Sequence, residues 1–377
     1  MSQVDASQQQ MSLATRLLGL IVGGVLTLLS VIFGFVQDQP VQSIILYALA
    51  TMALFSFFCL PFVTHVPVLA ENNLGIDPKS TAYGVLYGCL GLGAVIGSLS
   101  IGTVFAASSK RRIVRRGLLG YAVAMVIFCL ADTVLLLTIA RFVQGLGQAF
   151  LWLSAYTIVA DVADETGRGH DFGTIDEAAN RGALIGTMAG FFLIFTLEGA
   201  GLDLTHVWFW VFAAYTAPAL VALWNGWRGV GETRPEAVLQ PVERRPMSAQ
   251  LVALMGIVFV TGASSAMVWP LLMVFLQDAL NADVRTLTWA YLPAALISSF
   301  LPSRMGRIAD RLGRKMPMMA GLLMGALASA LIPHLRNIVP LIVLWAVESL
   351  GYTASMPAER AFVADIAGKD TRGTSYG

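Results

Sequence analysis

The chain has 377 residues, of which 56% are hydrophobic and 12% are charged, and its formal net charge at pH 7 is +1. Soluble domains contain about a quarter charged residues, so this composition excludes a soluble globular protein and indicates a membrane protein. A net charge this small gives no indication of nucleic-acid binding. The three cysteines all lie inside apolar runs, so we expect neither a disulfide framework nor a metal site.

Membrane-spanning helices dominate the predicted secondary structure. A helix that crosses the bilayer needs about 20 apolar residues, and eleven segments meet this requirement. The predicted fold class is therefore all-α, a polytopic membrane protein, and its fourth helix is expected to start near Ile113. The segments comprise residues 17–36, 43–70, 81–106, 117–131, 134–160, 178–197, 205–227, 249–276, 286–303, 316–334 and 338–358.

The orientation of these helices follows from the basic residues. Most of the 24 Lys and Arg residues lie in alternate loops, whereas the intervening loops hold Lys79, Arg285 and Arg336. Because cytoplasmic loops are enriched in Lys and Arg, the basic loops are predicted to be cytoplasmic. The helix at 17–36 then has its N-terminus outside. It lacks the basic region of a signal peptide and is predicted to be retained.

The helix at 43–70 contains one histidine, His65, four residues after Pro61. Its side chain is a candidate for lining a central cavity. A lone histidine among apolar residues is also consistent with a structural role, and the sequence leaves both interpretations open.

Three polar residues form a stripe on the helix at 134–160. Arg141, Gln144 and Gln148 recur at i, i+3 and i+7, which places them on one helical face. Arg141 lies about 10 Å inside the outer boundary, where a charge costs at least about 2.5 kcal/mol. We expect the stripe to face a central cavity, where partners offset this cost.

Glycines recur on one face of the helix at 178–197, where they would let another helix approach closely. Ordinary small-residue packing is an equally simple explanation of the pattern. Asp176 and Glu177 are expected to open this helix, because the helix dipole favours negative charge there without any catalytic role. The glycine motif consists of Gly173, Gly182, Gly186 and Gly190.

A charged segment connects the helices at 286–303 and 316–334. Such a short hinge needs glycines where two helix ends approach closely and basic residues on the inner face. One carboxylate, Asp310, can sit at the N-terminus of a neighbouring helix. A basic loop required only by topology is the alternative. The residues of this gating loop are Gly306, Asp310, Arg311, Gly313, Arg314 and Lys315.

The helix at 338–358 carries a second polar stripe, which includes Glu348 and Tyr352. Glu348 lies near the middle of the bilayer, where a carboxylate is expected to be protonated or paired. A titrating carboxylate opposite the fixed guanidinium of Arg141 is a physical basis for proton coupling. A pair that only ties two helices together is the alternative. Glu359 and Arg360 are expected only to mark the inner membrane edge.

An internal repeat relates the two halves of the chain. A shift of 204 residues aligns residues 159–169 with residues 363–373, and six of the eleven positions are identical. The same shift places Gln144 on Glu348. A parallel repeat of two homologous halves is typical of several secondary-transporter folds.

Three of these motifs resemble those of the major facilitator superfamily of secondary transporters. Residues 306–315 resemble its signature loop, G-x-x-x-D-R-x-G-R-K, and Ala106 stands at the Asp position in the first copy. Residues 141–147 resemble the R-x-x-Q-G-x-G pattern of proton-coupled members. The glycine motif resembles the antiporter motif, except that Thr187 replaces its proline.

The resemblance implies two helical bundles that alternate access to a central cavity. It also implies that Asp310 caps the start of the helix that begins near residues 173–180. The second bundle has four predicted helices, so the last two helices of the fold are expected to be missing. The expected parts are an N-terminal segment with an extra helix at 1–42, a six-helix bundle at 43–228, a cytoplasmic linker at 229–247 and a C-terminal bundle at 248–377.

The predicted function is proton-coupled antiport that exports small organic, drug-like molecules across the inner or plasma membrane. The expected partners are a small-molecule substrate, protons and the lipid bilayer, without a cofactor or nucleic acid, and the oligomeric state is open. No G-x-x-x-x-G-K-[ST] loop occurs, which argues against ATP-driven export. A sugar or metabolite importer and a transport-incompetent fragment remain alternatives. A membrane-embedded enzyme is disfavoured, because no His, Asp or Cys cluster occurs at one interface.

Overall fold

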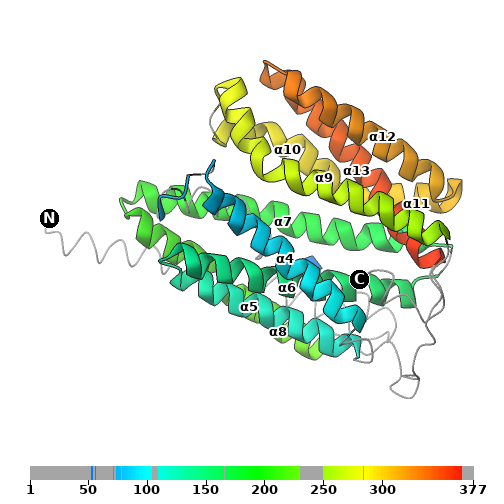
Figure 1. Cartoon of the computed structure of the whole chain (residues 1–377), viewed down its shortest axis with the longest axis horizontal. Helices are drawn as coiled ribbons and strands as arrows, with labels where there is room; N and C mark the ends of the chain where they lie inside the picture. The colour runs from blue at the N-terminus through cyan, green and yellow to red at the C-terminus, as the bar shows by residue number, and fades with distance from the viewer. Residues whose placement is uncertain are drawn as a thin grey trace, which may run out of the picture. The chain divides into compact units, whose positions relative to one another are not determined.

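The computed structural model describes residues 52–53, 56, 71, 74–77, 79–103, 109–164, 166–229, 249–282 and 284–366. In these residues every regular element is a helix (Figure 1). The elements are α4 (Thr81–Thr103), α5 (Lys110–Leu130), α6 (Val134–Val162), α7 (Arg168–Gly199), α8 (Leu204–Gly229), α9 (Ala249–Leu280), α10 (Val284–Phe300), α11 (Pro302–Leu312), α12 (Lys315–Leu331), the 3-10 helix η2 (Ile332–His334) and α13 (Ile338–Ile366).

The helices group into two compact units, and α6 and α7 contribute to both. Unit 1 contains α4 to Ser100, α5, α6 to Trp152, α7 from Gly182, and α8. Unit 2 contains α6 from Leu153, α7 to Arg181, and α9 to α13. The boundaries between the two units therefore fall within the helices α6 and α7, and not only in the segments that connect helices. The bundle boundaries expected from the sequence remain a prediction.

Long apolar faces are exposed on these helices, which is the reverse of a soluble protein. On α5, Leu118 and Met125 are buried, whereas Leu119, Val123 and Leu130 are exposed. An exposed apolar face on a helix of membrane length is suited to contact with lipid. Within the described ranges, six helices are long and apolar enough to cross a membrane: Thr81–Ile101, Lys110–Leu130, Val134–Val162, Arg168–Gly199, Lys315–His334 and Ile338–Ile366.

The packing of α5 against α6 recurs in the packing of α12 against α13. A Cβ on Gly147 would lie 2.9 Å from the carbonyl oxygen of Gly117, and a Cβ on Gly351 would lie 2.5 Å from that of Gly321. The two glycine pairs are related by the 204-residue shift of the sequence repeat, and so are both ends of α6 and α13. The repeat is therefore present in the helix packing as well as in the sequence.

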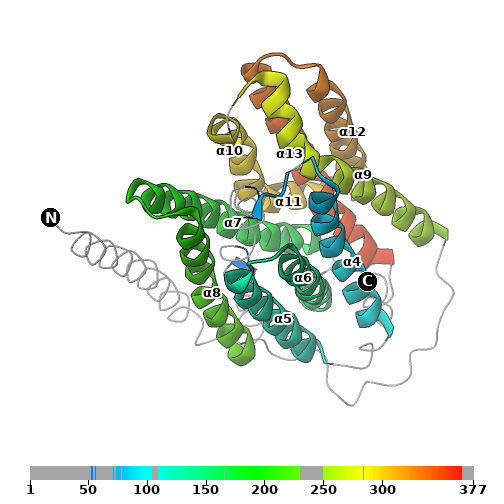
Figure 2. The ribbon, with the colours of Figure 1, turned by 60° about the vertical axis from the view of Figure 1, so that its left-hand side comes forward.

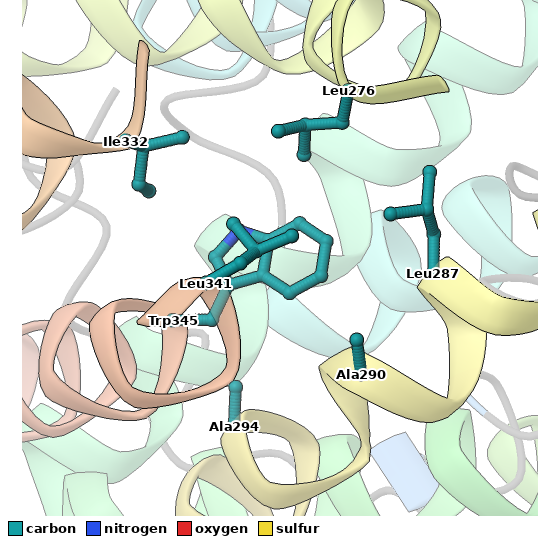
Figure 3. Close-up of a cluster of buried hydrophobic side chains, with 7 residues drawn as sticks. All are labelled: Leu276, Leu287, Ala290, Ala294, Ile332, Leu341 and Trp345. Atoms are coloured by element: carbon teal, nitrogen blue, oxygen red, sulfur yellow. The ribbon is translucent and has the colours of Figure 1, made fainter. Parts of the chain in front are cut away.

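The core of unit 2 forms where α13 packs against α10 and α9 (Figure 2). Figure 3 shows Leu341 and Trp345 of α13 facing Ala290 and Ala294 of α10. These alanines leave room for the indole ring, because a larger side chain on α10 would hold the two helices apart. The ring of Tyr291 meets that of Trp345 edge to face at 5.4 Å between centroids. This interdigitation holds α10 and α13 as one block.

The start of α7 differs from the prediction. The sequence predicts a helix at 178–197 that Asp176 and Glu177 open, but α7 begins at Arg168, and both carboxylates lie about two turns inside it. A search for long apolar segments does not detect the first turns of α7, because their residues are polar. They are helical and buried because charged and polar groups of unit 2 pair with them, as described below.

The gating loop also differs, because most of it is helical. Residues 306–312 belong to α11, which begins at Pro302 directly after α10 ends. Proline suits the first turn of a helix, where its missing N–H leaves no intrahelical hydrogen bond unmade, so Pro302 is a favourable residue for the start of α11. Only Gly313 and Arg314 separate α11 from α12. Gly313 has φ +88°, a conformation that glycine adopts at little cost.

The structure describes only part of the N-terminal predictions. The predicted helix at 17–36, most of the segment at 43–70 and His65 lie outside the described residues. α5 begins at Lys110 rather than near Ile113. Its first turns are rich in arginine, and such side chains can bury their apolar stems while their charged ends reach the membrane interface.

Candidate functional site

A polar cluster surrounds Arg141 within unit 1. Arg141 is 0% exposed, and its Nη1 donates a hydrogen bond to Oε1 of Gln144 at 3.3 Å. Nε2 of Gln144 donates in turn to the hydroxyl of Tyr121 on α5 at 2.7 Å. The guanidinium lies 5.0 Å from the ring centroid of Tyr87 on α4. Side chains from three helices therefore converge on one buried cation.

Local sequence explains how this cluster is assembled. Helical i, i+3 spacing places the amide of Gln144 beside Arg141. The next residue, Gly145, has no Cβ, and the carbonyl oxygen of Leu90 on α4 occupies that space. The close approach of α4 brings the ring of Tyr87 over the guanidinium. A planar guanidinium suits such stacking, which partly offsets the cost of burying its charge.

A second group of charged residues joins the first turn of α7 to α11, to α13 and to the two-residue turn between α11 and α12, all within unit 2. Oδ1 of Asp310 accepts the backbone N–H of Gly169, and its Oδ2 accepts that of His170, both at 2.9 Å. Asp310 also forms an ion pair with Arg314, four residues later in the chain. Nε of Arg314 lies 3.1 Å from Asp365 on α13. Arg168 pairs with the other oxygen of Asp365.

We call this set the charged latch: Arg168, Gly169, His170, Asp310, Arg314 and Asp365. A carboxylate that accepts two N–H groups at a helix start satisfies donors that have no partner inside the helix and complements the helix dipole. The latch therefore holds the start of α7 against α11 through charge-assisted hydrogen bonds.

Glycines permit the contact between α7 and α11. A Cβ on Gly306 would fall on the backbone carbonyl of Gly169, and a Cβ on Gly173 would fall on that of Pro302. Backbone meets backbone at both points, and no flexible side chain can yield there. Gly173 of the glycine motif and Gly306 of the gating loop thus share one interface, which only the tertiary structure reveals.

The break between α10 and α11 is held by polar residues of α7. Oε1 of Glu177 accepts hydrogen bonds from the N–H of Ser303 at 3.1 Å and from its hydroxyl at 2.7 Å, at the start of α11. Nδ2 of Asn180 donates to the carbonyl of Ser298 at 2.9 Å, and Nε of Arg181 donates to that of Ser299 at 2.8 Å. These contacts satisfy backbone groups that a broken helix leaves open.

A buried ion pair joins α7 to α13 about two turns away from the latch. Nη1 of Arg360 contacts both carboxylate oxygens of Asp176, and the guanidinium carbon lies 4.0 Å from the ring centroid of Tyr156 on α6. The side chains of Arg360 and Asp176 are 15% and 12% exposed. The expectation that Asp176 opens a helix is wrong, because α7 begins at Arg168. Arg360, expected only to mark the membrane edge, also forms this ion pair.

Comparison with known proteins identifies the architecture. A family model described as the Major Facilitator Superfamily matches residues 49–251 and 254–377. The chain belongs to this superfamily. It is accordingly a multi-pass membrane protein and a secondary transporter of small molecules rather than an enzyme. No curated protein sequence matches it.

A solved structure supports the same fold for this superfamily member. The crystal structure of the human organic anion transporter MFSD10 (TETRAN) is similar to this chain with a TM-score of 0.65. The sequence identity is 16%, and the match covers 90% of this chain and 89% of the human chain. At this identity the likeness establishes the transporter fold alone.

The remaining predicted cavity residues of this transporter occupy varied surroundings. Glu348 is half-buried and accepts a hydrogen bond from the hydroxyl of Ser329 on α12 at 2.7 Å. Gln148 is half-buried, and Tyr352 is 53% exposed. Arg141 belongs to unit 1 and Glu348 to unit 2. Their apposition across a cavity stays a prediction.

The other predicted motif residues divide between buried and exposed positions. Gly182, Gly186 and Gly190 are all buried, and the hydroxyl of Tyr215 on α8 donates to the carbonyl of Gly186 at 3.0 Å. Arg311 and Lys315 of the gating loop are exposed. Across the described ranges, no group of three or more His, Cys, Asp or Glu side chains could hold a metal ion.

Proposed function

We propose that this transporter exports small organic molecules in exchange for protons. The observation that carries the proposal is the complete burial of Arg141 inside an apolar helix, held by Gln144 and the rings of α4 and α5. A buried cation in a membrane helix is costly and is usually retained for function. In this superfamily member it is a suitable group for binding substrate or for controlling a carboxylate that takes up protons.

Glu348 is the carboxylate that we assign to proton uptake. It lies at the repeat-equivalent position of Gln144, and the hydroxyl of Ser329 is hydrogen-bonded to it. A hydroxyl can donate to an ionised carboxylate and can accept from a protonated one, so this partner suits both states. The pairing supports a residue that changes protonation during transport.

The charged latch supports the alternating-access part of the proposal. It consists of hydrogen bonds and ion pairs among the start of α7, α11, Arg314 and α13, all of which can break without distorting a helix. On the predicted topology the latch lies at the cytoplasmic side. We propose that the cytoplasmic entrance is closed when the latch is formed and opens when it separates.

We further propose that the preferred substrate is an organic anion. A buried guanidinium attracts a carboxylate, sulfonate or phosphate group and repels a cation. The human transporter of similar fold is named as an organic anion transporter, which agrees with this assignment. Export and import of the anion would use the same binding residues. An assay distinguishes the two directions of transport by the direction of the imposed pH gradient.

The test uses the purified protein in liposomes with an imposed pH gradient. We expect gradient-driven accumulation of the organic anion fluorescein, and none of a rhodamine cation of similar size. Glu348→Gln should lose accumulation against the gradient but keep exchange of fluorescein, because the amide resembles the protonated carboxyl and cannot release a proton. The measurement is internal probe fluorescence over time.

Two comparisons make this test decisive. Arg141→Lys should impair fluorescein transport nearly as much as Arg141→Ala, because an ammonium cannot reproduce the stacked, planar contact with Tyr87. Parent-like accumulation by Glu348→Gln would remove Glu348 from the mechanism and make His65 the next carrier to test. Equal transport of the cation would refute the assignment of an anionic substrate.

A further inference from the structure

The boundary between α10 and α11 lacks two helical hydrogen bonds. In a continuous helix the N–H of residue 302 would donate to the carbonyl of Ser298, and that of Ser303 would donate to the carbonyl of Ser299. Pro302 has no N–H, so the first of these bonds cannot form. The second is replaced, because the N–H of Ser303 donates to Glu177 instead. We call this gap the Pro302 break.

On either side of the Pro302 break, α10 and α11 behave as one helix. Leu301, the residue between them, has helical φ and ψ and donates its N–H to the carbonyl of Ile297 at 3.0 Å. Its own carbonyl accepts the N–H of Met305 at 3.0 Å. Helical hydrogen bonds thus continue past the gap, and the break is a local opening in a single membrane helix.

Side chains of α7 satisfy the backbone groups that the Pro302 break leaves open. Two of these side chains, Glu177 and Arg181, also pair with each other, with Nη2 of the arginine 2.7 Å from Oε2 of the glutamate. They lie one helical turn apart, so this pair does not depend on α10 or α11. The contacts to the break are Asn180 with the carbonyl of Ser298 at 2.9 Å, Arg181 with that of Ser299 at 2.8 Å and Glu177 with the N–H of Ser303 at 3.1 Å.

We propose that α7 keeps the Pro302 break open only while α7 is docked, and that the break partly closes when the charged latch separates. Glu177, Asn180 and Arg181 are the positioning residues for this change. The inference rests on the proposed alternating access and adds a change within one helix to the separation of helices. The step leaves no charge alone, because Glu177 and Arg181 stay paired on α7.

The rearrangement exchanges hydrogen bonds and leaves no backbone group without a partner. The N–H of Ser303 moves from α7 to the carbonyl of Ser299, which α7 has released. The carbonyl of Ser298 receives no N–H from Pro302 and is hydrated instead, because water enters as α7 withdraws. Separation also admits water to the hydroxyl of Ser299, which within the described residues is buried without a partner.

A permanent proline kink explains only part of this arrangement. A proline removes one hydrogen bond from its helix, and α10 accommodates another proline, Pro293, inside its regular part. At Pro302 a second hydrogen bond is open, and α7 holds both its donor and its acceptor. α11 also carries Gly306 and Asp310 of the contact with α7, so closing the break turns these residues relative to α10. We therefore expect the latch to separate and the break to close in one step.

The experiment compares the two prolines of this membrane helix. Spin labels on cysteines introduced at Thr166 and Arg307, which line one pocket beside the latch, report the ratio of open to closed latch by pulsed electron paramagnetic resonance. The full protein is measured in lipid nanodiscs after replacement of the native cysteines. Pro302→Ala supplies an N–H that only the continuous helix uses, so the ratio should rise about two- to tenfold. Pro293→Ala supplies an N–H away from the break and should change the ratio less than about twofold.

A double variant tests whether α7 completes the break. Asn180→Leu leaves the carbonyl of Ser298 without a donor in the closed state, so it should raise the open-to-closed ratio about fivefold. In the Pro302→Ala background that carbonyl has a donor in its own helix, and Asn180→Leu should then raise the ratio less than about twofold. Equal effects in the two backgrounds would mean that Asn180 only packs α7 against α10 and would overturn the proposal.

A conservative variant tests the role of Glu177. Glu177→Gln should change the ratio less than Glu177→Ala, because the amide oxygen still accepts the N–H of Ser303. Equal effects would contradict the assignment of this backbone hydrogen bond to the switch. Should Asn180→Leu or Glu177→Ala fail to fold, the proline comparison decides alone. An unchanged ratio in Pro302→Ala, or an equal rise in Pro293→Ala, would overturn the proposal.

The outcome is separable from the proposed function, because the ratio is measured without substrate and without a pH gradient. A rise confined to Pro302→Ala, in a protein whose parent form does not accumulate fluorescein, would support the switch and refute proton-coupled export. Fluorescein accumulation by the parent, together with a parent-like ratio in Pro302→Ala, would support export and refute the switch. A single latch distance that none of these variants changes would also refute it.

Discussion

At the scale of single residues, the charged groups of this transporter are matched to different kinds of partner. Arg141 is held by an amide and aromatic rings, Asp310 by backbone N–H groups, and Asp176 by a guanidinium. Each partner stabilises a charge that a membrane segment would otherwise exclude. The partner also determines what happens when the charge changes. A backbone donor cannot move away from its helix, whereas a side-chain cation can.

Neutralising Asp310 is expected to weaken the charged latch. Asp310→Asn keeps the size of the side chain but offers only one acceptor oxygen to the N–H groups of Gly169 and His170. The loss at a helix N-terminus is about 1 kcal/mol, or about fivefold in the ratio of open to closed latch. Spin labels on cysteines introduced at Thr166 and Arg307, read by pulsed electron paramagnetic resonance at constant pH, measure this ratio as the populations of long and short distances.

The matched control is Asp171→Asn on the same first turns of α7. Its carboxylate contacts the ring of His170 rather than the backbone N–H groups that Asp310 accepts. We expect less than about 0.5 kcal/mol from this change. Equal opening in the two variants would show that the capping contact contributes nothing specific and that the gating loop serves topology alone.

At the scale of helices, glycine pairs determine how closely the elements approach. The contact of Gly117 with Gly147 and the contact of Gly321 with Gly351 join equivalent helices in the two copies of the repeat. The α7–α11 interface uses Gly169, Gly173 and Gly306, and the 204-residue shift places a glycine at each corresponding position, Gly373, Gly377 and Gly102. Close packing between equivalent helices is thus repeated inside each copy.

Adding a methyl group at Gly321 should destabilise the protein, and adding one at Gly325 should not. A Cβ at Gly321 would meet the backbone of Gly351, whereas a Cβ at Gly325 meets nothing within 4 Å. Overpacking against a backbone costs about 1–3 kcal/mol, and Gly→Ala at an open helical site gains about 0.5–1 kcal/mol. Thermal unfolding in detergent should show a lower midpoint for Gly321→Ala and an equal or higher one for Gly325→Ala. A lower midpoint for both variants would contradict the packing argument.

At the scale of the whole molecule, the membrane determines the pattern of exposure. Leucine, valine and phenylalanine side chains are exposed along the long helices, while Arg141, Gln144 and Asp176 are buried. This inverted distribution is stable only where lipid covers the apolar faces. The basic loops then determine which end of each helix lies in the cytoplasm.

The predicted topology can be tested by labelling from one side of the membrane. A cysteine introduced at Ser109, at the start of the arginine-rich α5, should be protected from an impermeant thiol reagent added outside intact cells. A cysteine at Asn281, in the turn between α9 and α10, should be labelled under the same conditions. Permeabilised cells provide the control, because both positions should then react. Labelling of Ser109→Cys in intact cells would reverse the orientation and move the charged latch to the outer side.

The sequence by itself determined the membrane class, the helices longer than a bilayer, the internal repeat and the superfamily. These features can be read from local composition and from motifs of fixed spacing. A membrane helix satisfies its backbone hydrogen bonds within its own segment, so its presence depends on that segment alone. The predicted starts at 134 and 338 are those of α6 and α13, whereas the predicted end at 358 falls short of the end of α13 at Ile366.

Only the tertiary structure decided which polar residues act together. The segment from Arg168 to Glu177 is polar enough to be mistaken for a loop, yet it is helical and largely buried because α11 and α13 supply its partners. Asp176 and Arg360 are 184 residues apart in the chain, and no local pattern relates them. The energy of such a pair depends on distance and on exclusion of water, two quantities that arise only when distant helices pack together.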